Sequence, residues 1–376
     1  MIKTVLFVNQ TGRFGGAERV LFDLLSRMDQ KRIKPILVCP VGEMQREAVK
    51  LNIAWIEVKE FQAIDTTRKQ FKVNDAIRTL KLAQKLNKVI KQTKPSLIYT
   101  NSVKSHLLIN LTKRKLPTIV RLHDFPGSFK GISKIMLKHS LSNSHYISCV
   151  SKSVENDVKG LLMRDSNSLG SQYNGYEIKT NNYVKQHYSK RIVIAGWLLD
   201  WKGYDIFVEA MEQIAELIPD WEFIIAGEAA KDVHGSIEYA QQLEFRVKNS
   251  RYANRFFMYG GYSSLQEVAC CAEHCIFVHA SIKPDPLPTV ILEASGMELP
   301  IVCSNLGGSI EIIENKVGGY VVPPTATMIA EHVLKLVSDA EQRLKVAANA
   351  RTNCLSFFSM KNYVNNMTEL ILQQAE

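Results

Sequence analysis

The amino-acid sequence predicts an α/β protein with parallel sheets, divided into two domains. Two observations lead to this prediction. Short apolar runs that are typical of buried strands alternate along the chain with longer stretches of helical periodicity, the pattern of parallel sheets. The chain has 376 residues, of which 46% are hydrophobic and 22% charged, and it is longer than one ordinary hydrophobic core supports.

Six strands are expected in the first half of the chain, at residues 5–9, 36–39, 54–58, 97–100, 118–122 and 146–150. The polar stretch that follows has little apolar periodicity and indicates an interdomain linker. Six more strands are expected after it, at residues 192–195, 223–226, 256–259, 276–279, 301–304 and 320–322. We therefore expect an N-terminal domain at 1–175, a linker at 176–190, a C-terminal domain at 191–355 and a helical tail at 356–376.

Charge is unevenly distributed along the chain. The net charge is +10, but residues 61–140 contain 17 basic residues and only three acidic ones. This asymmetry indicates an anionic partner for the first domain. A helix expected at 75–92 has lysines beside an apolar stripe, and it is either an ordinary solvated face or a surface attracted to an anionic membrane or a lipid diphosphate. Because no recognition motif accompanies the charge, nucleic acid is not an expected partner.

Other features indicate a cytoplasmic protein. No apolar stretch approaches the ~18 residues that span a bilayer. The first residues are typical of a buried strand rather than a secretion signal. Cys270, Cys271 and Cys275 cluster around His274 without a second pair at zinc spacing, so we expect reduced thiols and no metal. The basic first domain adds peripheral attachment to the inner face of a membrane as an option.

The segment at 284–294 is the most informative about function. Its prolines end a loop, and the apolar run that follows is expected to be helical. Asp285 then lies at the mouth of the helix and Glu293 about one turn inside it. Unpaired N–H groups at this N-terminus suit a diphosphate, and the two carboxylates suit sugar and ribose hydroxyls. These N–H groups belong to Leu287, Thr289 and Val290. The segment alone fits a Pro-capped surface helix with solvated acids equally well.

Further candidates follow expected strands, at the carboxyl edge where open parallel sheets bind ligands. Gly15 and Gly16 either let a ligand approach the backbone or allow a tight turn into a helix. His123 is either a structural histidine or a ligand contact. Lys202 is either solvated or positioned to bind a diphosphate. The second domain adds Gly227, Glu228 and Tyr262, of which Tyr262 equally fits a half-exposed surface aromatic.

In order and spacing these motifs resemble the retaining glycosyltransferases of family 4. The resemblance spans nearly the whole chain and rests on Gly15-Gly16-Ala17-Glu18, His123-Asp124, Asn174-Gly175, the segment 196–203, Asp285-x7-Glu293, Gly307-Gly308 and Gly318-Gly319-Tyr320. It implies the GT-B fold, with two facing Rossmann-like domains and a C-terminal helix that crosses back to the first.

The resemblance also implies roles for the candidate residues. Asp285 matches a glutamate that handles the donor and would hold sugar hydroxyls, and Glu293 would bind the ribose. Lys202 would neutralise the diphosphate, but Trp197 stands where the family usually has a second cation, an arginine. His123 would position the sugar. Contacts to the nucleobase, largely through backbone groups, would come from the loops with Gly227, Glu228 and Tyr262.

The expected reaction is transfer of a hexose from a nucleoside diphosphate sugar, a UDP-sugar by preference, to a saccharide or lipid-linked saccharide in surface polysaccharide assembly. The resemblance implies retention of configuration by same-face attack, without a protein nucleophile. The chain has no Asp-x-Asp motif, so we expect neither a metal nor a cofactor. Two alternatives stay open: an epimerase or phosphorylase of the same fold, and a non-catalytic scaffold, which Trp197 and the shortened Asp285 favour.

Overall fold

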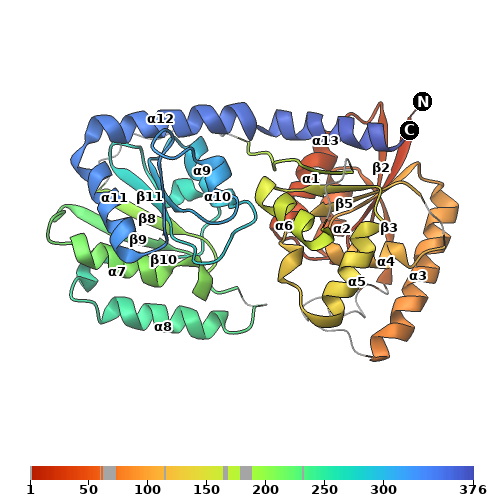
Figure 1. Ribbon diagram of the computed structural model, residues 1–376, viewed down its shortest axis with the longest axis horizontal. Helices are drawn as coiled ribbons and strands as arrows, with labels where there is room; N and C mark the ends of the chain where they lie inside the picture. Colours follow the sequence, from red (N-terminus) through yellow and green to blue (C-terminus); the bar gives the residue numbers. More distant parts are fainter. Residues whose placement is uncertain are drawn as a thin grey trace. The chain divides into compact units, whose positions relative to one another are not determined.

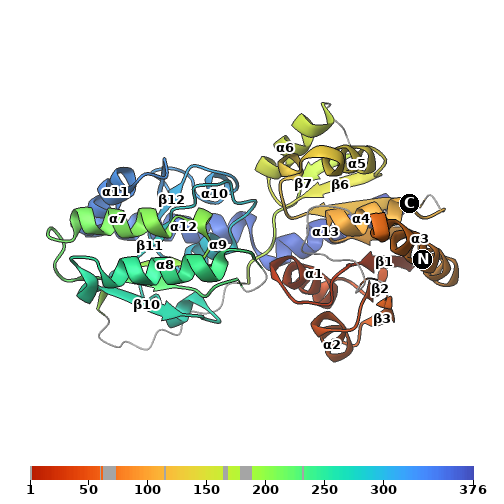
Figure 2. The same cartoon turned by 90° about the horizontal axis from the view of Figure 1, so that it is seen from below.

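The computed structural model describes residues 2–59, 61, 73–113, 116–163, 168–177, 189–230 and 233–376, with residues 73–80 described as backbone only. The chain divides into two units (Figures 1 and 2). Unit 1 contains Met1–Gly175 and Met360–Glu376, and unit 2 contains Tyr176–Ser359. Most of the linker expected at 176–190 lies outside the described residues, and its last residue, Lys190, already belongs to a strand.

Unit 1 is built on a parallel sheet in the order β3-β2-β1-β4-β5-β6-β7. Its strands are β1 Lys3–Val8, β2 Ile33–Cys39, β3 Ala54–Glu57, β4 Leu97–Thr100, β5 Thr118–Leu122, β6 Tyr146–Cys149 and β7 Leu169–Ser171. The interior strand β1 pairs with β2 on one side and β4 on the other, and its apolar run is buried on both faces, as in other parallel sheets. The expected strands omitted β7, because its three residues form neither an apolar run nor an alternation.

Helices cover both faces of this sheet. One hydrophobic cluster joins the sheet to α1 Gly16–Arg27, α2 Glu43–Lys50 and α13 Met360–Gln374, and a second joins it to α3 Val73–Thr93 and α4 Val103–Asn110. After β5 and β6 come α5 Gly131–Ser142 and α6 Lys152–Leu162. Each cluster contains the strand side chains that point to its own face, so successive residues of β1 alternate between the two cores.

The basic helix expected at 75–92 is α3, and its apolar stripe is part of the core. Leu82, Leu86 and Ile90 are fully buried in the second cluster, whereas Lys81 and Lys85 are exposed. Over residues 81–93, the apolar residues of α3 therefore face the sheet and its lysines face solvent. Within the described ranges, no helix is long and apolar enough to cross a membrane.

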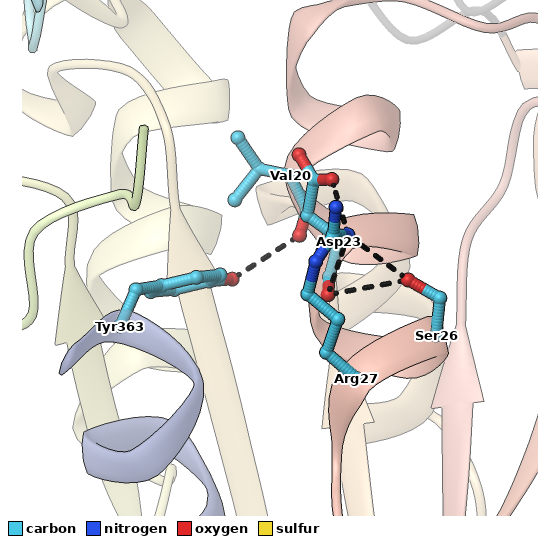
Figure 3. Close-up of polar contacts among 5 residues, drawn as sticks. All are labelled: Val20, Asp23, Ser26, Arg27 and Tyr363. Atoms are coloured by element: carbon cyan, nitrogen blue, oxygen red, sulfur yellow. Dashed lines mark hydrogen bonds and ion pairs between the residues drawn. The ribbon is translucent and has the colours of Figure 1, made fainter. Parts of the chain in front are cut away.

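The C-terminal helix α13 belongs to unit 1, as the fold prediction requires. Tyr363 donates a hydrogen bond from its hydroxyl to the carbonyl of Val20 on α1, at 3.3 Å (Figure 3). On the next turn of α1, Arg27 forms an ion pair with Asp23 at 2.9 Å (Figure 3). Because the last seventeen residues complete the core of a sheet that begins at β1, the two ends of the chain stabilise one unit together.

An Ile371→Ala variant tests this contribution. Ile371 is fully buried between α13 and the sheet, so the cavity should lower the free energy of unfolding of unit 1 by about 2–5 kcal/mol. Chemical denaturation monitored by circular dichroism measures the change. Gln373→Ala on the exposed side of the same helix is the control, and it should change stability by less than about 0.5 kcal/mol.

Unit 2 is built on a second parallel sheet in the order β10-β9-β8-β11-β12-β13. Its strands are β8 Lys190–Ala195, β9 Trp221–Ala226, β10 Phe256–Gly260, β11 Cys275–His279, β12 Ile301–Ser304 and β13 Tyr320–Val322. The helices are α7 Tyr204–Ile214, α8 Ser236–Lys248, α9 Thr289–Gly296, α10 Ser309–Ile312, α11 Ala326–Ser338 and α12 Ala340–Phe357. α7 and α11 pack together over one face, and α9, α10 and α12 pack over the other (Figure 1).

Both sheets reverse their strand order at an internal point. In unit 1 the chain builds outward from β1 to β3 and then restarts on the other side with β4. In unit 2 the same reversal lies between β8 and β11. Open parallel sheets bind ligands outside the carboxyl ends of their strands at such a point. A ligand is therefore expected at the loops after β1, β4, β8 and β11.

Candidate functional site

In unit 2, glycines bring the loop after β8 against the end of β11. Gly203 has a positive φ of 80°, and a Cβ atom there would lie only 1.9 Å from the carbonyl oxygen of Ala280. Gly227, after β9, approaches Gly196 equally closely. Only glycine tolerates both the conformation and the contact at position 203. The result is that Lys202, the residue before Gly203, is held beside the loop that follows β11.

Lys202 and Asp285 form a nearly buried ion pair at this point. The Lys202 ammonium lies 2.5 Å from Oδ2 of Asp285, and the side chains are 19% and 11% exposed. The ammonium also lies 4.3 Å from the ring centre of Trp201. Burial works to raise the pKa of Asp285, but the polar contact with His279 and the charge of Lys202 outweigh it and hold this pKa well below its ordinary value. Two residues predicted to act separately are therefore each other's partner here.

His279, the last residue of β11, completes this cluster and was not among the predicted site residues. Its Nε2 atom lies 3.7 Å from Asp285 and 3.2 Å from the Ser281 hydroxyl, and its buried Nδ1 atom has no hydrogen-bond partner among the described residues. Burial lowers the pKa of His279 despite the neighbouring carboxylate, which indicates a neutral ring. The sequence could have indicated His279, because it is the last residue of the strand expected at 276–279.

The loop that carries Asp285 is fixed by two glycines that follow β12. The N–H group of Gly308 donates to the carbonyl of Asp285 at 2.7 Å. Gly307 has a φ of 62°, and a Cβ atom there would lie 2.2 Å from the same carbonyl oxygen. The backbone of Asp285 is thus held by direct glycine contacts, which leaves its carboxylate aimed at Lys202.

The N-terminus of α9 presents free donors beside Asp285. The helix begins at Thr289, directly after Pro288, whose side chain cannot cap it. Within the described part of the chain, the N–H groups of Leu287, Thr289 and Val290 have no acceptor. Thr289 is exposed and Val290 partly exposed, while the Leu287 side chain is buried. N–H donors without an acceptor at a helix N-terminus, next to a lysine, favour binding of an anion.

Glu293 lies one turn further along α9 and is linked to the loop after β10. Its Oε1 atom accepts from the N–H group of Leu265 at 2.7 Å and from the Ser264 hydroxyl at 3.3 Å. Burial, and then the charge of Glu293, raise the pKa values of both Tyr262 and Tyr176. The structure therefore brings Glu293 and Tyr262 together, and it adds Tyr176, which the sequence did not single out.

Gly227 and Glu228 close β9 at the same edge of the sheet. Gly227 is buried and donates to the carbonyl of Gly260 at 2.7 Å. Glu228 accepts through its backbone carbonyl from Leu198 at 3.0 Å, while its side chain is exposed near Gly261. Both residues thus shape the loops through their backbone and leave the Glu228 carboxylate in solvent.

The candidate residues of unit 1 lie at its own switch point, after β1, β4 and β5. Asn101 donates through its amide to Asn9 and to the carbonyl of Ala17, both at 3.2 Å, and its oxygen lies 3.2 Å from Nε2 of His123. The Asn101 oxygen can only accept a hydrogen bond, so this contact requires that Nε2 of His123 carries the proton. Burial, then the charge of Arg121, lowers the pKa of His123 to about 3, so its imidazole is neutral.

Gly15 and Gly16 open α1, where the Glu18 carboxylate accepts from the Gly15 N–H group at 3.1 Å. Glu18 therefore stabilises the start of the helix. A Cβ atom on Gly16 would meet nothing within 4 Å, and its φ is not in the left-handed region. Packing and backbone conformation do not require glycine at position 16, so a tight turn does not explain it.

Two residues before His123, β5 contains a fully buried arginine, Arg121, which the sequence did not single out. It donates to the Ser148 hydroxyl at 2.8 Å and to the Asn174 side chain at 2.7 Å. Another donor reaches the carbonyl of Gln172 at 2.6 Å. Its cation ties the ends of β5, β6 and β7 together and helps to keep His123 neutral.

No metal site emerges from the described residues, in which no group of three or more His, Cys, Asp or Glu side chains could hold an ion. The seven cysteines are free, and Cys270 and Cys275 are buried. The arrangement instead provides a lysine, N–H groups at the start of α9 and a carboxylate beside the switch point of unit 2. Together they suit a phosphate joined to a hydroxyl-bearing group.

Comparison with known protein families gives two matches. Residues 14–176 match the family described as Glycosyltransferase Family 4, and residues 177–353 match Glycosyl transferases group 1. The putative glycosyltransferase YtcC of Bacillus subtilis is 23% identical over 274 residues, 67% of each chain. Alpha-D-kanosaminyltransferase of Streptomyces kanamyceticus is 29% identical over 162 residues, 42% of this chain and 39% of that one. Several curated relatives are thus matched over half of their length or less.

Solved structures share the fold. HepE from Anabaena, in complex with UDP, superposes with a TM-score of 0.80 over 98% of this chain and 100% of that one, at 19% identity. A glycosyltransferase from Rickettsia africae gives the same TM-score over 100% and 99% of the two chains, at 18% identity. The fold is therefore GT-B, as predicted, and the two adjoining family matches cover most of the sequence. The chain belongs to the group 1, family 4 type of glycosyltransferases.

Proposed function

We propose that the protein is a retaining glycosyltransferase that transfers a hexose from a nucleoside diphosphate sugar to a saccharide or lipid-linked saccharide in surface polysaccharide biosynthesis. The observation that supports this most directly is the Lys202–Asp285 pair at the switch point of unit 2, beside the N–H donors of α9. A diphosphate needs cations and donors, and a sugar needs a carboxylate that accepts from its hydroxyls. Both requirements meet within one loop cluster.

In this proposal the diphosphate draws Lys202 away from Asp285. The ammonium and the N–H groups of Thr289 and Val290 stabilise the charge that develops on the leaving diphosphate, so that the reaction proceeds without a metal. The freed carboxylate of Asp285 then accepts from the sugar hydroxyls. Glu293 accepts from the ribose. Contacts to the nucleobase come from the loops with Gly227, Glu228 and Tyr262.

The acceptor hydroxyl attacks the sugar from the same face from which the diphosphate leaves. The configuration is therefore retained without a protein nucleophile. His123 would position the sugar, because its neutral imidazole can donate or accept a hydrogen bond but is a poor acid at neutral pH. Gly15 and Gly16 would let the ligand approach the start of α1, where a Cβ atom on Gly16 would meet nothing within 4 Å. We propose UDP as the donor nucleotide. The GT-B neighbour HepE, which has been solved with UDP and with UDP-glucose, supports this choice.

A second candidate is a non-catalytic partner protein of the same fold. The observation that favours it is Trp197, whose side chain is 53% exposed at the position where the family usually supplies a second cation. An epimerase or a phosphorylase of the same fold is the remaining alternative. An epimerase would convert the sugar nucleotide without any acceptor, and a phosphorylase would require orthophosphate.

Calorimetric titration with nucleoside diphosphates and their sugars, without added metal, tests the proposal. We expect one nucleotide to bind, and Glu293→Ala to weaken it by about tenfold or more, because a carboxylate that accepts two ribose hydroxyls contributes roughly 1.5–3 kcal/mol. Glu298→Ala, which removes a half-exposed acid just after α9, is the control. If no nucleotide binds the wild-type protein, the scaffold alternative replaces this proposal.

A further inference from the structure

Helix α5 presents a largely exposed apolar face. Ile132 and Ile135 are 76% and 71% exposed, and Met136, on the same face, is 37% exposed. These positions are spaced i, i+3 and i+4, so their side chains lie on one side of the helix. Leu137 and Leu141 are buried and attach the other side to unit 1. α5 thus has two apolar sides, one used for packing and one turned outward.

Lysines flank this apolar face, in a stretch of sequence without acidic residues. Lys134 and Lys138 are exposed on α5, and Lys130 is exposed just before it. No Asp or Glu occurs between residues 125 and 154. Asp124 comes just before this stretch and is exposed, and the first acids after it are engaged within unit 1, since Glu155 pairs with Lys159 at 3.0 Å and Asp157 accepts from the N–H group of Gly127. The surface therefore combines large apolar side chains with lysines that form no ion pair among the described residues.

We propose that α5 docks unit 1 on an anionic lipid surface, with Ile132, Ile135 and Met136 at the acyl boundary and the lysines at the headgroups. This combination of an apolar face and flanking lysines is what an interfacial helix requires. A second copy of the chain is a poorer occupant, because the lysines of two α5 helices would repel each other. Helix α3 is more basic, but its apolar side chains from Leu82 onward are in the core and cannot insert.

The inference rests on the proposed function for its purpose, which is access to a lipid-linked acceptor. Its test needs neither donor nor acceptor, so the two proposals can fail separately. The full chain is sedimented with vesicles of phosphatidylcholine alone and with vesicles that also contain phosphatidylglycerol, at low and high salt. The wild-type protein should sediment only with the anionic vesicles, and less at high salt as the charges are screened.

Two double variants of α5 separate the apolar and charged contributions. Ile132→Ser with Ile135→Ser should lower partitioning onto anionic vesicles by about tenfold or more. Lys134→Gln with Lys138→Gln should lower it by about 25-fold, at about fivefold per lysine. All four side chains are exposed, so the fold should be retained, and circular dichroism verifies this.

Matched controls come from surfaces that lack the combination. Phe245→Ser removes an aromatic side chain that is 70% exposed on α8 of unit 2. Lys81→Gln with Lys85→Gln removes two exposed lysines of α3. Both should partition within about twofold of the wild type, because neither surface inserts into the lipid. The inference is overturned if the α5 variants bind like the controls, if the wild type binds no vesicles, or if the isoleucine variant instead abolishes self-association of the chain.

Discussion

A Lys202→Ala variant is expected to lose about 10²–10³-fold in kcat for sugar transfer, the cost of removing one preorganised group that stabilises a developing negative charge. The loss should fall on kcat more than on KM, because the charge on the diphosphate grows in the transition state. Trp197 offers no cation in compensation. Lys202 therefore has to stabilise more of the charge on the diphosphate than the matching lysine does in family members that also have the arginine.

Removing Lys202 also leaves a buried carboxylate without its ion-pair partner. Asp285 then keeps only its contact with the neutral His279, and the free energy of unfolding should fall by about 3–5 kcal/mol at neutral pH. The depressed pKa of Asp285 contributes stability that is present above the unfolded pKa of ~3.9 and is lost as pH falls through the lower folded value. In Lys202→Ala this loss on acidification should be smaller. The double variant Lys202→Ala, Asp285→Asn should recover stability but not activity.

Initial rates of sugar transfer and denaturation curves measure these effects. Lys283→Ala is the matched control, because Lys283 is an exposed lysine of the same loop, two residues before Asp285. It removes the same charge without breaking the Lys202–Asp285 pair, and it should change kcat by less than about twofold, since exposed charges are screened by solvent. Wild-type kcat in Lys202→Ala would remove Lys202 from the proposed mechanism.

Most of the fold could be predicted because parallel strands that are covered on both faces are continuous apolar runs. The residues of β4, β5 and β12 are buried, largely apolar runs, and their predicted positions match. β7 escaped prediction because three residues, one of them glycine, form a strand only through pairing with β6. That pairing is a tertiary effect with no local signal.

The candidate site shows the same limit. Asp285, Glu293 and Lys202 could be singled out because charged residues stood beside proline and glycine loops at strand ends. The ion pair that joins Lys202 to Asp285 spans 83 residues of sequence and depends on the approach of Gly203 to β11, which no local pattern reveals. Arg121 looked like an ordinary strand residue, since only burial distinguishes it.

The ion pair leads to the second large effect, which concerns Asp285→Asn. In the wild-type protein a diphosphate must separate Lys202 from a carboxylate 2.5 Å away before it can use the ammonium fully. Asparagine holds an ammonium less strongly, because charge-assisted hydrogen bonds contribute roughly twice as much as neutral ones. Asp285→Asn should therefore bind the nucleoside diphosphate alone about tenfold more tightly.

The same variant should lose the preference for the complete donor. In the proposed mechanism the carboxylate accepts hydrogen bonds from the sugar hydroxyls, and in the variant these hydroxyls meet an amide instead. The affinity for the nucleotide sugar should therefore fall relative to the affinity for the nucleotide. The kcat should fall by about 10²-fold or more. Calorimetry with both ligands measures the ratio. Glu293→Gln is the control, because a ribose contact is common to both ligands and its loss should weaken them equally. If Asp285→Asn binds the nucleotide more weakly than the wild type, Lys202 does not exchange partners. The ion pair would then be a structural element of the loop, and the positive charge for the diphosphate would have to come from another residue.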